Sequence, residues 1–286
     1  MRKTGSHFFA TRSSVDAASA TLSPSVHPSS VVEDGARLDA GVAIGPFCHI
    51  GAGVEIGDGA TLHSHVVVGG CTRIGARARI FPFAAVGLAS QDIKAALAPG
   101  ALTIGDDCVI REGVTINAGV GEGTRIGARC VFLAASHVAH DCRLGDDVIL
   151  SNQVLLGGHV EIGDHAMIGG ATAVHQNVRI GAHAFVGGLS GVEGDVIPFT
   201  LASGNRAHLF GLNRVGLQRR GFAPERIERL RRAYGLLFAR EARALSERID
   251  RLSRDFADDA DVAAIVEFLR APSTRPLCAP RARAEP

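Results

Sequence analysis

The chain has 286 residues, of which 46% are hydrophobic but only 5% aromatic, with no Trp and a single Tyr. A net charge of +1 gives no bulk field for nucleic acid, and no apolar run reaches membrane-spanning length. The six Cys include no CxxC pair, which argues against a zinc site and favours a reducing compartment. We therefore expect a cytoplasmic protein with no membrane span, no nucleic-acid partner and a core of aliphatic residues.

Residues 1–25 are rich in Ser and Ala, and Asp16 is their only acidic residue. They contain no apolar core long enough for a secretory signal. We expect a disordered N-terminal extension here, with an organelle-targeting segment as the alternative.

Residues 26–198 repeat every six residues. Stepping by six from Val26 meets an aliphatic or Phe residue at almost every position, and the register is interrupted at residues 87–103 and 119–123. A unit this short cannot fold alone and must stack on its copies. The pattern predicts a parallel β-helix in which three hexads close one triangular coil. Residues eighteen apart then lie above one another, about 4.8 Å apart.

The first interruption carries Gln91, Asp92 and Lys94 on a polar excursion. A long excursion from a solenoid usually lines a site or packs on a neighbouring subunit. A tolerated surface insertion is the alternative.

The C-terminal part changes to helical periodicity. After an expected linker at residues 199–222, a helical domain at residues 223–272 is predicted to begin at Pro224, with further helices near residues 241–256 and 261–270. These helices would cap the open end of the coil. The Pro-rich residues 273–286 are expected to form a flexible tail.

Histidine is the most informative residue type. None of the coil histidines falls at the inward positions of a hexad, so a buried core role is disfavoured, although a solvated surface role stays open. The eighteen-residue rule places His140, Gly158 and Gln176 in one column, with His159 and His175 in the adjoining columns. A base beside open glycine N–H groups on a rigid wall indicates an acyl-transfer site.

A single flat wall cannot enclose a substrate. Three triangular prisms packed side by side would make clefts between them, so we expect a homotrimer with its sites at subunit interfaces.

Four segments carry a family resemblance. The chain resembles the acyl-ACP:UDP-N-acetylglucosamine O-acyltransferases, which start lipid A synthesis, over residues 26–222. The segments that carry it are His137–Cys142, Gly157–Val160, Ala173–Gln176 and Gly216–Phe222. The resemblance implies that the β-helix is left-handed and that it is followed by a helical C-terminal part like that of the family.

The resemblance also implies roles. His140 would be the general base, Asp141 would orient it, and the Gly158 N–H would hold the oxyanion. The acyl chain would move directly from acyl carrier protein to UDP-N-acetylglucosamine, with no cofactor and no metal.

The other implied roles concern binding. Substrate would be held by residues on the coil wall, on the excursion of a neighbouring subunit and after the coil (His137, His159, His175 and Gln176; Asp92 and Lys94; Asn213, Arg219 and Arg220). The last group would also help to dock the carrier. Gly188 falls where family members set acyl length. Asn117 and Val215 depart from the His and Glu that family members usually carry there.

Three alternatives stay open. An N-acyltransferase acting on a related UDP-amino sugar shares the fold, but it normally has an N-terminal domain for which 25 residues are too few. A metal-dependent hydratase would need three histidines, such as His137, His140 and His159, to converge between subunits on zinc or a similar ion. A catalytically silent scaffold is the third.

Overall fold

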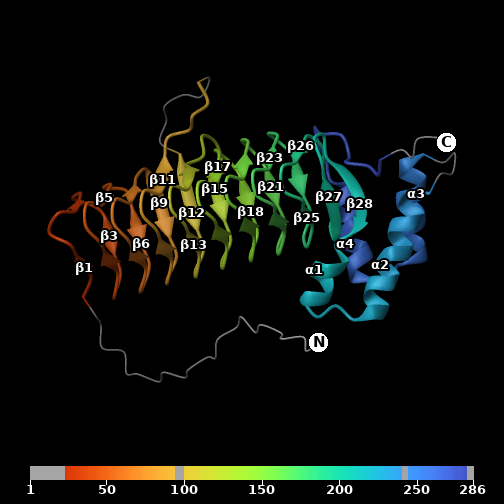
Figure 1. The fold of residues 1–286 in the computed structure, drawn as a ribbon, viewed down its shortest axis with the longest axis horizontal. Helices are drawn as coiled ribbons and strands as arrows, with labels where there is room; N and C mark the ends of the chain where they lie inside the picture. Colours follow the sequence, from red (N-terminus) through yellow and green to blue (C-terminus); the bar gives the residue numbers. More distant parts are fainter. Residues whose placement is uncertain (1–22, 94–99, 240–243, 282–286) are drawn as a thin grey trace, which may run out of the picture.

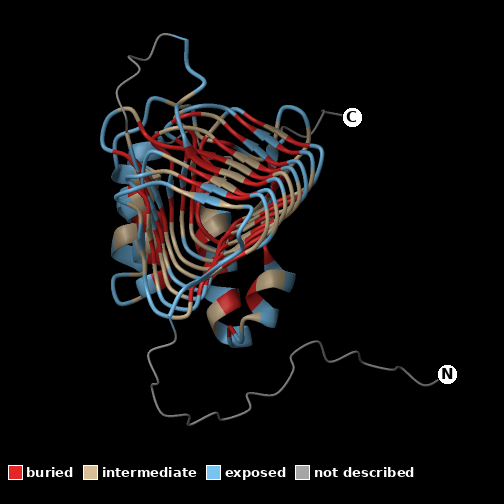
Figure 2. Ribbon diagram, turned by 90° about the vertical axis from the view of Figure 1, so that its left-hand side faces the viewer, coloured by how far each residue is buried: buried red, intermediate tan, exposed pale blue. Residues whose placement is uncertain are grey.

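The hexads form a long three-sided coil of very short strands, and the described residues that follow it include four α-helices (Figure 1). The computed structural model describes residues 23–93, 100–239 and 244–281. Figure 2 looks along the coil axis and shows the triangular cross-section. The predicted fold class, a parallel β-helix with a C-terminal helical part, is confirmed.

Each wall of the coil is one sheet, and all strands pair in parallel except the last strand of sheet A. Sheet A consists of β1 (Ser25–Val26), β4 (Ala43–Ile44), β7 (Thr61–Leu62), β10 (Arg79–Ile80), β13 (Val109–Ile110), β16 (Val131–Phe132), β19 (Ile149–Leu150), β22 (Met167–Ile168), β25 (Phe185–Val186), β27 (Thr200–Ser203) and β28 (His208–Leu212). Sheet B consists of β2 (Val31–Val32), β5 (His49–Ile50), β8 (Val67–Val68), β11 (Ala85–Leu88), β14 (Thr115–Asn117), β17 (His137–Val138), β20 (Leu155–Leu156), β23 (Ala173–Val174) and β26 (Gly191–Val192). Sheet C consists of β3 (Arg37–Leu38), β6 (Glu55–Ile56), β9 (Cys71–Ile74), β12 (Ala101–Ile104), β15 (Thr124–Ile126), β18 (Arg143–Leu144), β21 (Glu161–Ile162) and β24 (Arg179–Ile180).

The core of the coil is a column of inward side chains, and the buried side chains of the C-terminal helices join the same hydrophobic cluster. The aliphatic or Phe residue that opens each hexad is buried from Ile44 to Val192, and Phe132 is the largest of the fully buried side chains. The small residues at the fifth position are buried with them, including four of the six Cys. Val26 is 40% exposed because no coil lies above it to cover the open N-terminal end.

The two interruptions of the hexad register change the number of residues between stacked positions. Ile74 pairs with Ile104, thirty residues later instead of eighteen, because the excursion adds twelve residues. Ile116 pairs with Val138, twenty-two residues later, because the glycine-rich break adds four. Each insertion leaves the sheets in register and bulges out at a corner of the coil.

The expected linker at residues 199–222 is structured instead. Strand β27 continues sheet A by pairing in parallel with β25, and β28 folds back antiparallel on β27. Helix α1 (Arg214–Arg219) follows. The hexad period ends here because β28 turns back antiparallel on β27 instead of continuing the turns of the coil. The register that signalled the coil therefore disappears before the sheet does.

The remaining helices are α2 (Pro224–Leu237), α3 (Leu245–Asp255) and α4 (Ala260–Arg270). As predicted, α2 has Pro224 in its first turn, and it runs unbroken through Gly235. Helix α3 is shorter than the predicted 241–256 segment, whose first three residues lie outside the described ranges. None of the helices in the described part of the chain could cross a membrane.

The tail is not loose over its described part. Leu277 forms a parallel bridge with Asp195, and Pro280 forms one with Leu209. Cys278 between them is only 5% exposed. The expected flexible tail is therefore wrong for residues 273–281, because their backbone hydrogen-bonds to the last coil. Residues 282–286, and most of the expected disordered extension, lie outside the described ranges.

Candidate active site

The predicted stacking of the histidine-bearing coils is confirmed. Strand β17 pairs with β20, and β20 pairs with β23, each eighteen residues further along the chain. At the corner between sheets B and C, the His140 C=O accepts the His159 N–H at 3.0 Å. One coil further on, the Gly158 C=O accepts the Asn177 N–H at 3.0 Å. This corner therefore presents side chains from three successive coils.

His140 and Gly158 lie against each other within this corner. A Cβ atom placed on Gly158 would lie 2.5 Å from His140 Nε2, which is closer than real Cβ atoms approach other atoms. Among the hydrogen bonds between described residues, none uses the Gly158 N–H. Glycine is thus required beside the ring, and it leaves a backbone donor free next to the imidazole.

The His140 ring is held from its other side. His140 Nδ1 lies 2.9 Å from Asp141 Oδ2. The Asp141 carboxylate also accepts the N–H groups of Val120 (3.0 Å), Gly121 (3.0 Å) and Gly123 (3.3 Å). Burial alone would raise the pKa of Asp141, but these backbone N–H groups and His140 outweigh it and lower the pKa to about 2. The second interruption of the hexads, at residues 119–123, therefore forms a set of backbone N–H groups that binds this carboxylate.

This arrangement fixes how the ring can act. An ionised carboxylate can only accept hydrogen bonds, so Asp141 assigns the ring proton of neutral His140 to Nδ1. Nε2 then carries a lone pair and faces the side of Gly158. A base with an oriented lone pair beside a free N–H can remove a proton and stabilise a developing oxyanion.

A hollow of about 380 Å³ opens beside His140, and Gln91, Asp92, Asn117, His137, Ala139 and Gln176 complete its lining. The excursion was expected to reach a neighbouring subunit, but Asp92 lines this hollow within its own chain. The Asn117 side chain explains this because its Nδ2 donates to the Ala89 C=O at 3.1 Å and holds the start of the excursion against the coil. Lys94 lies outside the described residues.

Two polar side chains on the wall of this hollow are buried or half-buried. His137 Nδ1 lies 2.7 Å from the Thr115 hydroxyl, and burial lowers the pKa of His137, so its imidazole is neutral near pH 7. Asn117 is buried, and its Oδ1 has no hydrogen-bond partner among the described residues. In the sequence, Asn117 stood out only as a departure from the family pattern. Its burial could not be predicted, because it depends on the bulge where the excursion leaves the coil.

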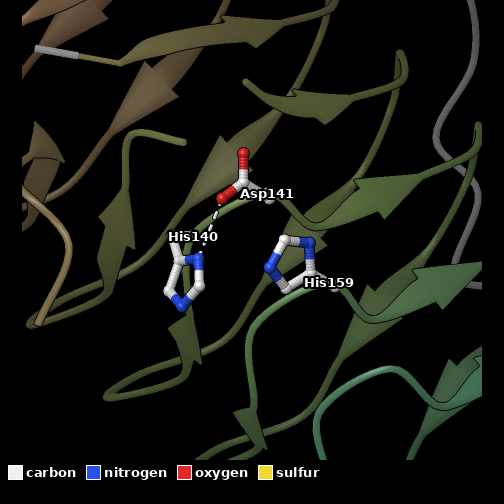
Figure 3. Close-up of side chains that lie close together, drawn as sticks. All are labelled: His140, Asp141 and His159. Atoms are coloured by element: carbon white, nitrogen blue, oxygen red, sulfur yellow. Dashed lines mark hydrogen bonds and ion pairs between the residues drawn. The ribbon is translucent and has the colours of Figure 1, made fainter. Parts of the chain in front are cut away.

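His159 stands beside the His140–Asp141 pair (Figure 3). Its ring meets the His140 ring edge-on, with centroids 5.1 Å apart. One ligand atom from each of His140, Asp141 and His159 lies within 4.8 Å of the others, and this is the one possible metal-holding group among the described residues. Within one chain this group does not include His137, the third histidine that a hydratase would draw together between subunits.

The other predicted binding residues lie at the corner between sheets C and A. Asn213 caps α1 by accepting the Gly216 N–H at 3.1 Å, and its Nδ2 donates to the His183 C=O at 3.0 Å. Arg220 donates to the His165 C=O at 2.5 Å, while Arg219 is exposed. Within one chain these residues are therefore not brought to the hollow beside His140.

Gly188 lies at the third corner, between sheets A and B, where it is exposed. His175 and Gln176 lie on the coil that follows Gly158, and both are exposed. The tail reaches them there: Arg275 Nε donates to the Gln176 C=O at 2.8 Å, and the same guanidinium contacts His175 Nδ1. No pattern in the sequence predicted that contact, which joins residues about one hundred positions apart.

A coil of hexads with a histidine–carboxylate pair at one corner defines a hexapeptide-repeat transferase. A family model for the bacterial transferase hexapeptide (six repeats) matches residues 35–70. Another, described as UDP N-acetylglucosamine O-acyltransferase, domain 2, matches residues 195–278.

Curated relatives narrow this class. The chain is 44% identical to the acyl-[acyl-carrier-protein]–UDP-N-acetylglucosamine O-acyltransferase of Thermodesulfovibrio yellowstonii, over 88% of this chain and 98% of that protein. It is 46% identical to the enzyme of the same name from Rhizobium johnstonii, over 89% of this chain and 94% of that protein. The chain belongs to the family of acyl-[acyl-carrier-protein]–UDP-N-acetylglucosamine O-acyltransferases.

Solved structures agree with this assignment. The crystal structure of the UDP-N-acetylglucosamine O-acyltransferase from Moraxella catarrhalis is similar with a TM-score of 0.85 at 37% identity, covering 88% of this chain and 99% of that one. The UDP-N-acetylglucosamine acyltransferase of Campylobacter jejuni is similar with a TM-score of 0.84 at 36% identity, covering 90% of this chain and 100% of that one.

Proposed function

We propose that this protein transfers an (R)-3-hydroxyacyl chain from acyl carrier protein to the glucosamine 3-hydroxyl of UDP-N-acetylglucosamine, the first step of lipid A biosynthesis. The names of the curated relatives support acyl carrier protein and UDP-N-acetylglucosamine as the substrates. The observation that supports the chemistry most strongly is the placement of His140 Nε2 against Gly158, with Asp141 bound to the opposite ring nitrogen.

In the proposed reaction, His140 Nε2 takes the proton of the sugar hydroxyl as its oxygen attacks the thioester carbonyl. The Gly158 N–H donates to the carbonyl oxygen as it becomes an oxyanion, and Asp141 stabilises the imidazolium. When the intermediate collapses, the C–O bond remains, the C–S bond breaks, and the proton passes from His140 to the departing thiolate. A positioned base contributes roughly 10²–10⁴-fold, and one oxyanion donor contributes roughly 10²–10³-fold.

Substrate binding is proposed for the polar residues around this pair. Gln176, Asp92 and neutral His137 line the hollow, so they would contact the sugar or the pantetheine arm. His159 and His175 stand exposed on the same corner and would extend the site outward. The Asn117 side chain lines the hollow, and its Oδ1 has no hydrogen-bond partner among the described residues, so it would accept a hydrogen bond from a bound ligand.

The outer faces of the coil support a homotrimer. Sheet C carries a charged outer face, whereas the outer face of sheet A is mainly apolar and that of sheet B is apolar in large part. The residues concerned are Arg37, Glu55, Arg73, Arg125, Arg143, Glu161 and Arg179 on sheet C, Val109, Val131, Ile149, Met167 and Phe185 on sheet A, and Val31, Val67, Ala85, Leu155 and Ala173 on sheet B. Phe47, Phe83 and Leu189 at the A–B corner are 60%, 65% and 80% exposed. Large apolar surfaces mark interfaces, and a three-fold axis along this corner would pack sheet A of each prism on sheet B of the next.

That packing would also complete the site. It places the B–C corner of one subunit, with His140, beside the C–A corner of its neighbour, with Asn213, Arg219 and Arg220. Arginines suit a diphosphate and an acidic carrier protein, so we propose that these residues serve the site of the adjacent subunit. We also propose a cytoplasmic location, since all six Cys are free.

The proposal is tested with purified protein, UDP-N-acetylglucosamine and a panel of carrier-bound 3-hydroxyacyl chains. Mass spectrometry of the product should find one acyl ester per sugar, and light scattering should give three chains per particle. Transfer only to a UDP-amino sugar, with an amide product, would replace the proposal by the N-acyl alternative. Stoichiometric bound metal and carbon dioxide hydration without acyl transfer would replace it by a hydratase.

A further inference from the structure

The tail after α4 returns to the coil along a fixed path. The Arg275 N–H donates to Ser273 Oγ at 3.0 Å, and the Pro276 C=O accepts the Asp195 N–H at 2.8 Å. The Cys278 N–H donates to the Asp195 C=O at 2.8 Å. Arg275 therefore sits between two anchored points of the backbone, and its side chain leaves the tail at a defined place.

From that place, the Arg275 guanidinium reaches the coil that follows Gly158. Nε donates to the Gln176 C=O at 2.8 Å, and Nη2 contacts His175 Nδ1. A guanidinium can only donate hydrogen bonds. His175 Nδ1 also lies 3.3 Å from the Gln176 C=O, but that oxygen already accepts the Arg275 Nε–H at the shorter distance of 2.8 Å. Nδ1 is therefore the acceptor for the guanidinium, which places the proton of the neutral ring on Nε2.

The same turn packs directly on the oxyanion corner. A Cβ on Gly157 would lie 2.7 Å from the Gln176 backbone nitrogen, so the two turns are in close contact. Gln176 itself lines the hollow beside His140. Any movement of this turn would therefore change both the wall of the hollow and the support beneath Gly157 and Gly158.

We propose that Arg275 is a positioning residue of the acyl-transfer site. It holds the His175–Gln176 turn against the Gly157–Gly158 turn and fixes His175 as an Nε2–H donor for an oxygen of the bound nucleotide sugar. This inference rests on the proposed function and assigns a task to the C-terminal tail. The planar guanidinium contacts Gln176 and His175 at the same time through Nε and Nη2. A lysine ammonium lacks this geometry, so lysine cannot fully replace arginine here.

The test compares Arg275→Ala and Arg275→Lys with wild type in steady-state acyl transfer, varying UDP-N-acetylglucosamine at saturating acyl carrier. We expect Arg275→Ala to raise the KM for the sugar nucleotide about tenfold, the size of one lost hydrogen bond to a charged group, and to change kcat much less. Arg275→Lys should lie between the two. Arg270→Ala is the matched control, since Arg270 is an exposed tail-side arginine paired with Asp250 of α3, and it should behave as wild type.

A second readout does not depend on turnover. Nitrogen-15 NMR of labelled histidines should show His175 with an unprotonated Nδ1 in wild type and in Arg270→Ala, and a mixture of tautomers in Arg275→Ala. An unchanged KM with an unchanged tautomer in Arg275→Ala would overturn the inference. So would an equal loss of kcat and thermal stability with KM intact, which indicates a purely structural anchor. If wild type transfers no acyl chain, the proposed function fails, while the NMR result still decides whether Arg275 sets the tautomer.

Discussion

Nε2 of His140 faces Gly158 of the next coil so closely that the glycine has no room for a side chain. Gly158→Ala should therefore push the ring off its position and lower kcat by roughly 10²-fold or more, the value of a misplaced base or oxyanion donor. The thermal midpoint should change little, because the ring borders an open hollow and can move. Acyl-transfer kinetics and a melting curve measure the two effects.

Gly51→Ala is the control for this substitution. Gly51 also lies at a corner between sheets B and C, but its nearest neighbours are 3.5 Å from a Cβ. It should leave kcat unchanged. Equal kcat values for Gly158→Ala and wild type would show that the contact has no catalytic meaning.

Asp141→Asn should lower kcat by roughly 10²-fold, because an amide no longer stabilises the imidazolium that forms on His140.

Asp141→Asn should also change how the stability of the fold depends on pH in acid. Since the folded pKa of Asp141 is about 2 against an ordinary 3.8, the ionised carboxylate stabilises the fold above about pH 4, and this contribution disappears as the pH falls towards 2. Denaturation curves from pH 7 to 2.5 should show a gap of roughly 2 kcal/mol between wild type and variant that closes below pH 4. A gap that is constant with pH would contradict the assignment.

His183 should also make the fold less stable as the pH falls, but at milder pH than Asp141. It packs between Phe199 and Phe222, and burial, assisted by the charges of His165 and Arg220, lowers its pKa from 6.5 to about 4. The unfolded chain therefore binds a proton that the folded chain refuses, so stability falls as the pH drops from 6.5 to 4. His183→Phe keeps the ring stacking and removes the titration. Its unfolding free energy should fall less than that of wild type over this range; parallel curves would disprove the point.

Gly188→Met should shorten the preferred acyl chain. Gly188 is exposed at the A–B corner, where a Cβ atom would lie 3.0 Å from the Gly170 C=O, and a Met side chain would extend from there into the space beside the coil. Each buried methylene contributes about 0.8 kcal/mol, so preference between chains two carbons apart should shift by roughly tenfold. Competition between carrier-bound chains measures the ratio. The same ratio in wild type and variant would place the acyl pocket elsewhere.

The sequence could predict the coil and the principal site because both depend on one spacing rule. The hexad register identifies the buried positions, and the eighteen-residue stack brings His140 to Gly158 without knowledge of any other contact. This success stops where the period stops. Residues 199–222 were predicted to be a linker, because an antiparallel strand pair and a short helix carry no hexad repeat.

The parts that escaped prediction depend on contacts without periodicity. The break at residues 119–123 looked like a loss of pattern, but its backbone N–H groups bind the Asp141 carboxylate. The tail appeared loose because its prolines disfavour helix and strand, yet single hydrogen bonds fix it to the coil and aim Arg275 at His175. Such contacts join residues whose distance along the chain carries no signal.

The most direct test of this account is kcat for acyl transfer to UDP-N-acetylglucosamine by wild type and His140→Ala, each verified as folded by its melting curve. The account predicts that the variant loses roughly 10²–10⁴-fold in kcat, the contribution of a positioned general base, while retaining affinity for the sugar nucleotide. A folded His140→Ala variant that transfers the acyl chain at the wild-type rate would contradict it.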